Sequence, residues 1–331
     1  MSRRHPTLLA LLLAATVVAT AALPGSASST SPNAPAKTHA KISVVLVAGI
    51  ATDAFYLTMK KGAAAEAKAL GVNFSFTGSP AAFSPPTQIP FLNAAIARHP
   101  SVIMIAPTDV NALAAPIQRA ISAGIPVETV DTHINKPLAF TNISTDNPGG
   151  GALAAKALVQ AIGGSGEVAI MSTTPGVSTV DERVAGFTAE LKKHPDVTYL
   201  GLQYSNDDTP TAARLTSALL AAHPNLKGMF AVNVKSGDGV TSAVTSAGKA
   251  GTVKLVEFDA GPPQVAALRA GTIDALIAQY PYGIGKLGVQ LAVKWAKGQK
   301  SGIQKHYGTG SAVITRANVN TPAIKKYLYT P

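Results

Sequence analysis

Short apolar runs alternate with longer segments that carry one apolar face along most of this chain. The run Val127–Val130 is preceded by a Gly-Ile-Pro turn and followed by Asp131, and Lys254–Phe258 is likewise preceded by a glycine turn and followed by Asp259. Runs of this length predict strands, and the longer segments predict helices. Their regular alternation indicates βαβ units and a parallel sheet with helices on both faces.

The same pattern gives the predicted elements from Lys41 onward. The predicted strands are Ile42–Val47, Val72–Phe76, Val102–Ala106, Val127–Val130, Glu167–Met171, Thr198–Tyr204, Gly228–Val232, Lys254–Phe258 and Ala275–Gln279, with two short strands near 304–315. The predicted helices are Ala54–Leu70, Thr87–Arg98, Asn111–Ser122, Gly150–Ala161, Asp181–Lys193, Thr209–Ala222, Val240–Ser246, Pro263–Ala270 and Gly283–Lys297. The pattern restarts after a crossover at Asn142–Asn147, which favours two similar lobes.

The chain length supports two lobes as well, because 331 residues exceed what one hydrophobic core usually serves. We expect an N-terminal lobe at 41–144, completed by about 282–309. We expect a C-terminal lobe at 145–281, completed by about 310–331.

The first 40 residues follow a different pattern. Two arginines precede an apolar run, Leu8–Leu23, and a small-residue exit that ends at Ala27. This is the arrangement of a secretory signal peptide, so we expect residues 1–27 to be removed and 28–40 to form a polar linker. An uncleaved membrane anchor and twin-arginine export are the alternatives.

Charge and cysteine content narrow the function classes. Without residues 1–27 the chain keeps 26 basic and 17 acidic residues, a net charge of +9, but its lysines are scattered and form no basic block beside aromatic residues. Solvated surface is therefore favoured over nucleic-acid binding. The absence of cysteine excludes disulfides, thiol catalysis, thiolate metal sites and a lipid-modified cysteine. We expect a soluble monomer in a periplasm or outside the cell, with no cofactor or metal.

Asp131 and Asp259 stand in matching places, about half a chain apart. Ligands of open parallel sheets sit just outside the carboxyl ends of the strands. We therefore predict that each lobe offers one carboxylate to a common cleft, with loop acids or helix caps as the alternative.

Several short sequence motifs together resemble those of a known family. In chain order they are IAPTD (105–109), AGIPVETVDT (123–132), STDNPGGG (144–151), DERVAGF (181–187), FAVN (230–233), VEFDAGP (256–262) and AQYPYGIG (278–285). From Lys41 to the C-terminus the chain resembles the type I periplasmic binding proteins, specifically the ribose-binding-like sugar-binding proteins of ABC importers. The resemblance implies two similar Rossmann-like lobes, joined by a three-strand hinge, that close on a sugar and then meet a membrane permease.

The resemblance also implies the pocket residues. They are Asp53, Phe55, Tyr56, Asp131, Thr132, Arg183, Asn233, Asp259 and Gln279, with His133 and Asp207 as further candidates, and the hinge falls near 144–146, 279–281 and 307–310. Sugar hydroxyls both donate and accept hydrogen bonds, which suits acceptor-only carboxylates and a donor-only guanidinium. Aromatic rings suit the C–H face of a sugar.

Each assignment has a structural alternative. Arg183 could be a surface residue, the two aromatic residues could belong to the core, and Asn233 and Gln279 could satisfy backbone groups at strand ends. The run Gly149–Gly151 could cradle a phosphate, although close packing at a helix start is favoured.

The chain departs from the family's ribose binders at three places. Thr132-His133 follow Asp131, where the family's ribose binders carry an arginine. The polar run Asn206–Asp208 stands in place of an aromatic residue, and Asp53 stands where Asn is usual. The implied pocket has more carboxylates than a ribose site, and it lacks the aromatic residue of the second lobe that would cover one face of the sugar ring. We therefore expect an unusual furanose, a less common sugar or an acyclic polyol rather than ribose.

Catalytic motifs are missing from the sequence. It has no G-x-S-x-G, H-E-x-x-H or Walker motif and no dinucleotide fingerprint after the first strand, and an acid pair of the glycosidase type is disfavoured. The sequence predicts a non-enzymatic solute-binding protein that binds a monosaccharide or sugar alcohol for an ABC importer. The alternative is a sensing module that reports a furanosyl-type signal or sugar to a membrane receptor.

Overall fold

The computed structural model describes residues 41–330, so the predicted signal peptide and linker lie outside the described residues. Two six-stranded sheets organise this part of the chain. The first sheet has the strand order β11-β5-β4-β3-β1-β2 and the second has the order β12-β10-β9-β8-β6-β7. Strands of the first sheet are β1 (Ser43–Ala48), β2 (Asn73–Gly78), β3 (Val102–Ile105), β4 (Val127–Val130), β5 (Asn142–Thr145) and β11 (His306–Thr309). Strands of the second are β6 (Gly166–Ser172), β7 (Val197–Tyr204), β8 (Leu226–Ala231), β9 (Lys254–Phe258), β10 (Ala275–Ala278) and β12 (Ala312–Ile314).

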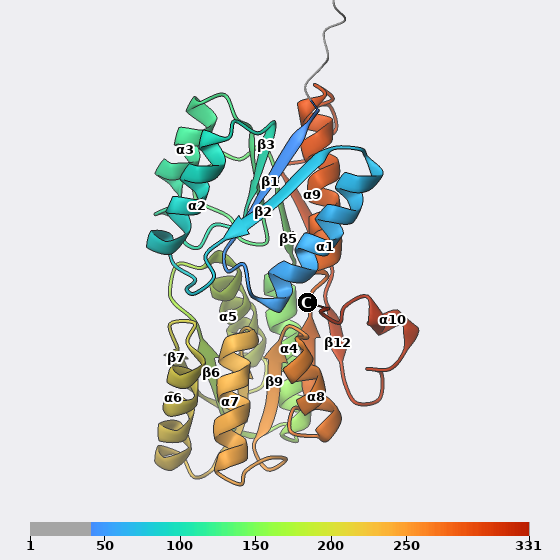
Figure 1. Cartoon of the computed structure of the whole chain (residues 1–331). Helices are drawn as coiled ribbons and strands as arrows, with labels where there is room; N and C mark the ends of the chain where they lie inside the picture. Colours follow the sequence, from blue (N-terminus) through green and yellow to red (C-terminus); the bar gives the residue numbers. More distant parts are fainter. Residues whose placement is uncertain (1–40, 331) are drawn as a thin grey trace, which may run out of the picture. The chain divides into compact units, whose positions relative to one another are not determined.

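Helices cover both faces of each sheet (Figure 1). Those of the first sheet are α1 (Ala54–Ala69), α2 (Pro85–Ala97), α3 (Ala114–Ser122) and α9 (Pro281–Ala296). Those of the second are α4 (Asn147–Ala161), α5 (Ser178–Leu191), α6 (Thr209–Ala222), α7 (Val234–Ser246) and α8 (Pro262–Ala270), and a short α10 (Pro322–Lys325) lies near the C-terminus. The predicted α/β fold with two similar lobes is confirmed.

Alternation along the strands builds two apolar layers in each lobe. In β1, Val44 and Leu46 pack with the buried residues of α1 and α9, whereas Val45 and Val47 pack with those of α2 and α3. Successive strand residues point to opposite faces, so a strand that is apolar throughout fits a sheet covered on both sides.

Three short segments connect the two sheets. The chain passes from β5 to α4, from β10 to α9, and from β11 to β12. Figure 1 shows α9, coloured as a late part of the chain, lying beside α1 in the half that the N-terminal residues build. Among residues 41–330, no helix is long and apolar enough to span a bilayer.

The structure corrects two sequence expectations. Helix α7 begins at Val234 rather than Val240, because Asn233 caps it by accepting a hydrogen bond from the Ser236 amide at 3.0 Å. The predicted crossover Asn142–Asn147 contains a strand, β5, which pairs in parallel with β4 and β11.

Candidate functional site

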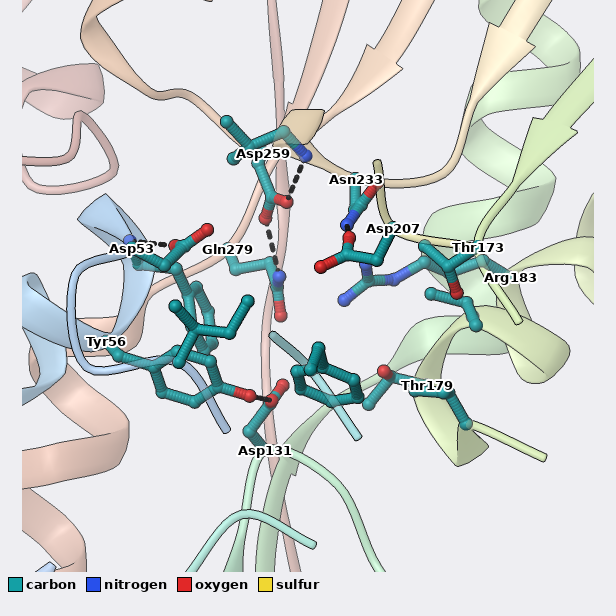
Figure 2. Close-up of a pocket in the computed structure, with 16 residues that line it drawn as sticks. Asp53, Tyr56, Asp131, Thr173, Thr179, Arg183, Asp207, Asn233, Asp259 and Gln279 are labelled. Carbon is teal, nitrogen blue, oxygen red and sulfur yellow. Dashed lines mark hydrogen bonds between the residues drawn. The ribbon is translucent and has the colours of Figure 1, made fainter. Parts of the chain in front are cut away.

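A cavity lies where the loops that follow the strands of the two sheets meet. The space between its side chains, including its opening to solvent, is about 500 Å³. Figure 2 shows carboxylates, one guanidinium and aromatic rings directed into it. The lining residues are Ile50, Asp53, Phe55, Tyr56, Phe83, Asp131, Thr173, Val177, Thr179, Val180, Arg183, Asp207, Asn233, Val234, Asp259 and Gln279.

The two strand-end aspartates meet in this cavity with matching backbones. Asp131 has φ 63° and Asp259 has φ 84°, in the left-handed region that non-glycine residues seldom adopt. The amide of each donates a hydrogen bond of 2.8 Å to the neighbouring strand, to the carbonyl of Ile143 and of Ile277 respectively. This strained conformation turns each side chain away from its strand and into the cavity, a use of strain found at ligand sites.

Asp131 interacts with the first lobe and with a cation from the second. The Tyr56 hydroxyl donates to Asp131 Oδ2 at 2.8 Å. Burial raises the pKa of Asp131 to about 6, although the positive charge of Arg183 and the Tyr56 hydrogen bond oppose that rise.

Asp259 is held more firmly. Its Oδ1 accepts hydrogen bonds from Gln279 Nε2 at 2.6 Å and from the Tyr329 hydroxyl at 2.7 Å, and its Oδ2 accepts one from the Val234 amide at 3.2 Å. Gln279 also accepts a hydrogen bond of 2.7 Å from Thr145 Oγ1 at the end of β5. Gln279 therefore links a strand end of the first sheet to the aspartate of the second.

Arg183 lies in α5 and is 3% exposed, so the alternative that it is a surface residue is wrong. Its Nε donates to Asn147 Oδ1 at 3.0 Å and its Nη1 to the Val232 carbonyl at 2.8 Å. The guanidinium carbon stands 3.8 Å from the centroid of the Phe258 ring. These contacts fix the guanidinium plane, and among residues 41–330 nothing accepts a hydrogen bond from Nη2.

Asp53 caps α1 and also lines the cavity. Its Oδ1 accepts the Phe55 amide at 2.7 Å. Burial, followed by the negative charges of Asp259 and Asp207, raises the pKa of Asp53 to about 7. Near neutral pH this carboxyl can therefore donate a hydrogen bond as well as accept one.

Asn233 lines the cavity and also satisfies a backbone group, which are the two roles predicted as alternatives. It caps α7, and its Nδ2 donates to Asp207 Oδ1 at 2.7 Å. Lys235 Nζ lies 3.4 Å from Asp207 Oδ2. Burial raises the pKa of Asp207, while Lys235 and Asn233 lower it.

The aromatic side chains of the cavity come from one lobe only. Phe55 and Tyr56 lie at the start of α1 with their rings 5.2 Å apart, edge to face, and Phe83 lies in the loop before α2. Phe55 and Tyr56 also belong to the apolar core, so these two residues both pack in the core and line the cavity.

Sequence reasoning missed Phe83, Thr173 and Thr179, which all line the cavity. The Thr173 hydroxyl is buried and has no hydrogen-bond partner in the described chain. Thr173 follows β6, so the rule that selected the two strand-end aspartates could have selected it too. Such a buried hydroxyl is a candidate to bind a ligand, because leaving it unpaired is unfavourable.

Two predicted residues lie outside the cavity lining. Thr132 is buried beside Asp131, and its hydroxyl has no partner among the residues that the structure describes. The His133 amide donates to Ser178 Oγ at 3.0 Å, and its ring Nδ1 lies 3.8 Å from Glu182 Oε1. His133 thus contacts the second lobe through α5, beside separate surface cavities.

Comparison with known proteins shows the family. The sequence model of a family described as periplasmic binding protein domain matches residues 44–300. The chain belongs to this periplasmic binding protein family. The ribose import binding protein RbsB of Salmonella typhimurium is 31% identical over 275 residues, which is 83% of this chain and 92% of that protein.

Solved structures of other family members are similar throughout. An ABC transporter solute-binding protein from Agrobacterium vitis, bound with α-D-tagatopyranose, is 42% identical with a TM-score of 0.86, covering 88% of this chain and all of that one. A carbohydrate transporter solute-binding protein from Agrobacterium radiobacter, in complex with D-arabinose, is 28% identical with a TM-score of 0.83, covering 87% and 99%. The resemblance to sugar-binding proteins of ABC importers is confirmed, and these relatives serve transport rather than catalysis.

Proposed function

We propose that this protein captures a single monosaccharide between its lobes outside the cytoplasm and delivers it to the permease of an ABC importer. The observation that carries the proposal is the pairing of Asp131 and Asp259 in one cavity with Arg183 and an aromatic wall. Carboxylates accept hydrogen bonds from ligand hydroxyls and the free Nη2 of Arg183 donates one. The relatives that carry sugars support this use of the cavity.

The first candidate ligand is a ketohexose in its pyranose form, with D-tagatose as the test compound. The relative bound with α-D-tagatopyranose is 42% identical over nearly the whole chain. The three aromatic side chains all lie on the first lobe and leave the other face of a sugar ring to Asp207, Asn233 and Arg183. A ligand with many hydroxyls suits such a one-sided apolar wall.

Binding proceeds by closure of the lobes about the three connecting segments. Contacts between loops of the two lobes support this mechanism: the Val110 amide donates to the Gly176 carbonyl at 3.0 Å, and the His133 amide donates to Ser178 Oγ at 3.0 Å. Closure removes water, which strengthens the polar contacts and makes an unmatched hydroxyl unfavourable. The closed pair of lobes then presents a new surface to the permease.

The cellular setting follows from the same proposal. The mature protein acts in a periplasm or outside the cell after cleavage of residues 1–27, as a monomer without catalytic activity. The lobes are 41–144 with about 282–309, and 145–281 with about 310–331.

A thermal-shift screen of the chain from Lys41 onward tests the proposal. The panel holds D-tagatose, other ketohexoses, aldopentoses, aldohexoses and sugar alcohols. A ligand at 100 times its dissociation constant stabilises by ~2.7 kcal/mol, which gives a clear shift in Tm. D-Tagatose is expected to give the largest shift. Tight binding of ribose with ketohexoses and sugar alcohols inert would contradict the ligand assignment, and no shift with any sugar would contradict the function.

A further inference from the structure

The last described residues of the chain reach the junction of the two lobes. After α10 the described chain turns back and ends beside α1, where the two halves of the structure meet (Figure 1). The side chain of Tyr329 is buried, with 4% of its surface exposed. Its side chain is not part of the cavity lining.

Tyr329 holds the second lobe by two hydrogen bonds. Its amide donates to the Ala260 carbonyl at 3.1 Å, and its hydroxyl donates to Asp259 Oδ1 at 2.7 Å. Burial and then the negative charge of Asp259 raise the pKa of Tyr329 well above its usual range, so the hydroxyl keeps its proton. Tyr329 therefore fixes the orientation of a carboxylate that faces the cavity.

The same segment holds the first lobe. The Tyr329 ring packs edge to face against Phe55 with 5.8 Å between centroids. The Thr330 amide donates to Thr58 Oγ1 in α1 at 3.0 Å. Both Phe55 and Thr58 belong to the first turns of α1, and Phe55 also lines the cavity.

We propose that Tyr329–Thr330 act as a clasp that joins the two lobes in the closed, sugar-bound form and positions Asp259 for the sugar. This inference rests on the proposed function. Two adjacent residues contact Asp259 on one side and α1 on the other, so opening the lobes must break one set of contacts. Ligand contacts and clasp contacts then stabilise the same closed state, and each strengthens the other.

Three variants test the clasp, with D-tagatose as the ligand. Tyr329→Phe removes only the hydrogen bond to Asp259. Thr58→Val removes the acceptor for the Thr330 amide together with the hydrogen bond of 2.8 Å that Thr58 Oγ1 donates to the Ala54 carbonyl within α1. Tyr329→Phe is expected to raise the dissociation constant ~10-fold, as for a bond to a charged group, and Thr58→Val about threefold. Tyr199→Phe is the control: this exposed tyrosine lies in β7, outside the cavity lining and the three connecting segments, so the affinity should not change.

The Tm of the ligand-free variants separates a clasp from ordinary core packing. A clasp that acts in the closed form leaves the ligand-free Tm of Thr58→Val near that of the wild type while sugar dissociates faster. A lower ligand-free Tm with unchanged affinity would show a packing role and overturn the inference.

A disulfide tests the contact without any sugar. The chain has no cysteine, so Thr58→Cys combined with Thr330→Cys allows a single intramolecular disulfide. Its formation on mild oxidation is expected, and thiols that stay free would overturn the clasp. A wild-type chain that binds no sugar would count against the proposed function alone, because the disulfide result still decides whether the segment reaches α1.

Discussion

Asp131 and Asp259 occupy equivalent places in the two lobes, but their surroundings differ. Both follow a strand, both have positive φ, and both accept a hydrogen bond from a tyrosine hydroxyl. Asp131 accepts one hydrogen bond among the described residues, whereas Asp259 accepts three.

The difference indicates a division of labour across the cleft. A carboxylate with three fixed donors is oriented before the ligand arrives, and removing it leaves three donors without an acceptor. Asp131 keeps more acceptor capacity for the ligand and relies on the charge of Arg183 across the cleft. We infer that Asp259 fixes the positions of neighbouring side chains in the cavity and that Asp131 mainly accepts hydrogen bonds from the ligand.

Replacing the two aspartates should give the largest effects and the clearest contrast. Asp259→Ala leaves Gln279, Tyr329 and the Val234 amide unpaired, so we expect the dissociation constant for D-tagatose to rise by more than ~100-fold, with a lower ligand-free Tm. Asp131→Ala should weaken binding ~10- to 150-fold, as for loss of charge-assisted bonds, with a smaller decrease in ligand-free Tm because only the Tyr56 hydroxyl loses its acceptor. Calorimetric titration and thermal unfolding measure both quantities. Equal losses of Tm in the two variants would remove the proposed division of labour.

Arg183 tests whether the cleft couples the lobes. Arg183→Ala should weaken binding ~10- to 150-fold, because the ligand loses the free Nη2 donor and Asp131 loses its cation. Arg183→Lys keeps the charge but not the planar contact with Phe258 or the separate bonds to Asn147 and Val232, so it should recover only part of the affinity. Arg183→Lys at wild-type affinity would reduce the role of the guanidinium to charge alone.

The buried glutamates of the central strands extend the comparison into the core. Glu257 in β9 accepts hydrogen bonds from Thr241 Oγ1 at 2.6 Å and Gln264 Nε2 at 3.0 Å. Glu128 in β4 is also fully buried, but neither carboxylate oxygen has a partner within residues 41–330, and burial raises its pKa well above the usual range. An unpaired buried polar group costs free energy that a paired one does not.

Substitution by methionine, which is similar in length, should therefore act in opposite directions. Glu128→Met should raise the free energy of unfolding by about 1 kcal/mol, and Glu257→Met should lower it by about 1–3 kcal/mol because two partners lose their acceptor. Denaturant unfolding at pH 7 gives both values. A loss of stability in Glu128→Met would mean that its carboxyl has a stabilising role.

Local patterns predicted the two lobes and the strand-end aspartates Asp131 and Asp259, because strand ends are encoded by neighbouring residues. The other predicted cavity residues, Asp53 among them, were implied by the family resemblance. Tyr329 could not be found in this way, since it reaches Asp259 from 70 residues away and no local pattern marks it. The predicted start of α7 was too late in the chain, because Gly237 and Gly239 disfavour a helix. In the structure Gly239 lets α7 approach α6 closely: an added Cβ would stand 2.6 Å from the Thr209 carbonyl.

The last comparison concerns Asp53, whose carboxyl interacts with the charges of Asp259, Asp207 and Lys235. Its pKa is about 7 in the folded protein against an ordinary value of 3.8, mainly because of burial. Between about pH 4 and pH 7 the folded chain holds this proton more tightly than the unfolded chain, so its contribution to stability falls as pH rises and is constant above about pH 7. Asp53→Asn does not titrate and keeps the cap on α1, since Asn caps helices as well as Asp.

The Tm of Asp53→Asn, relative to the wild type, should therefore increase steadily from pH 4.5 to pH 7.5. Asp131 and Glu257, with pKa values raised to about 6 and about 7, titrate in both chains, so their contributions largely cancel in the difference. Asp146→Asn makes the same change at the exposed cap of α4 and serves as the control. A difference that stays constant with pH would mean that Asp53 is ionised throughout. Asp53 would then meet the ligand as an acceptor only, and the two lobes would differ less in their chemistry than the hydrogen bonds of Asp131 and Asp259 suggest.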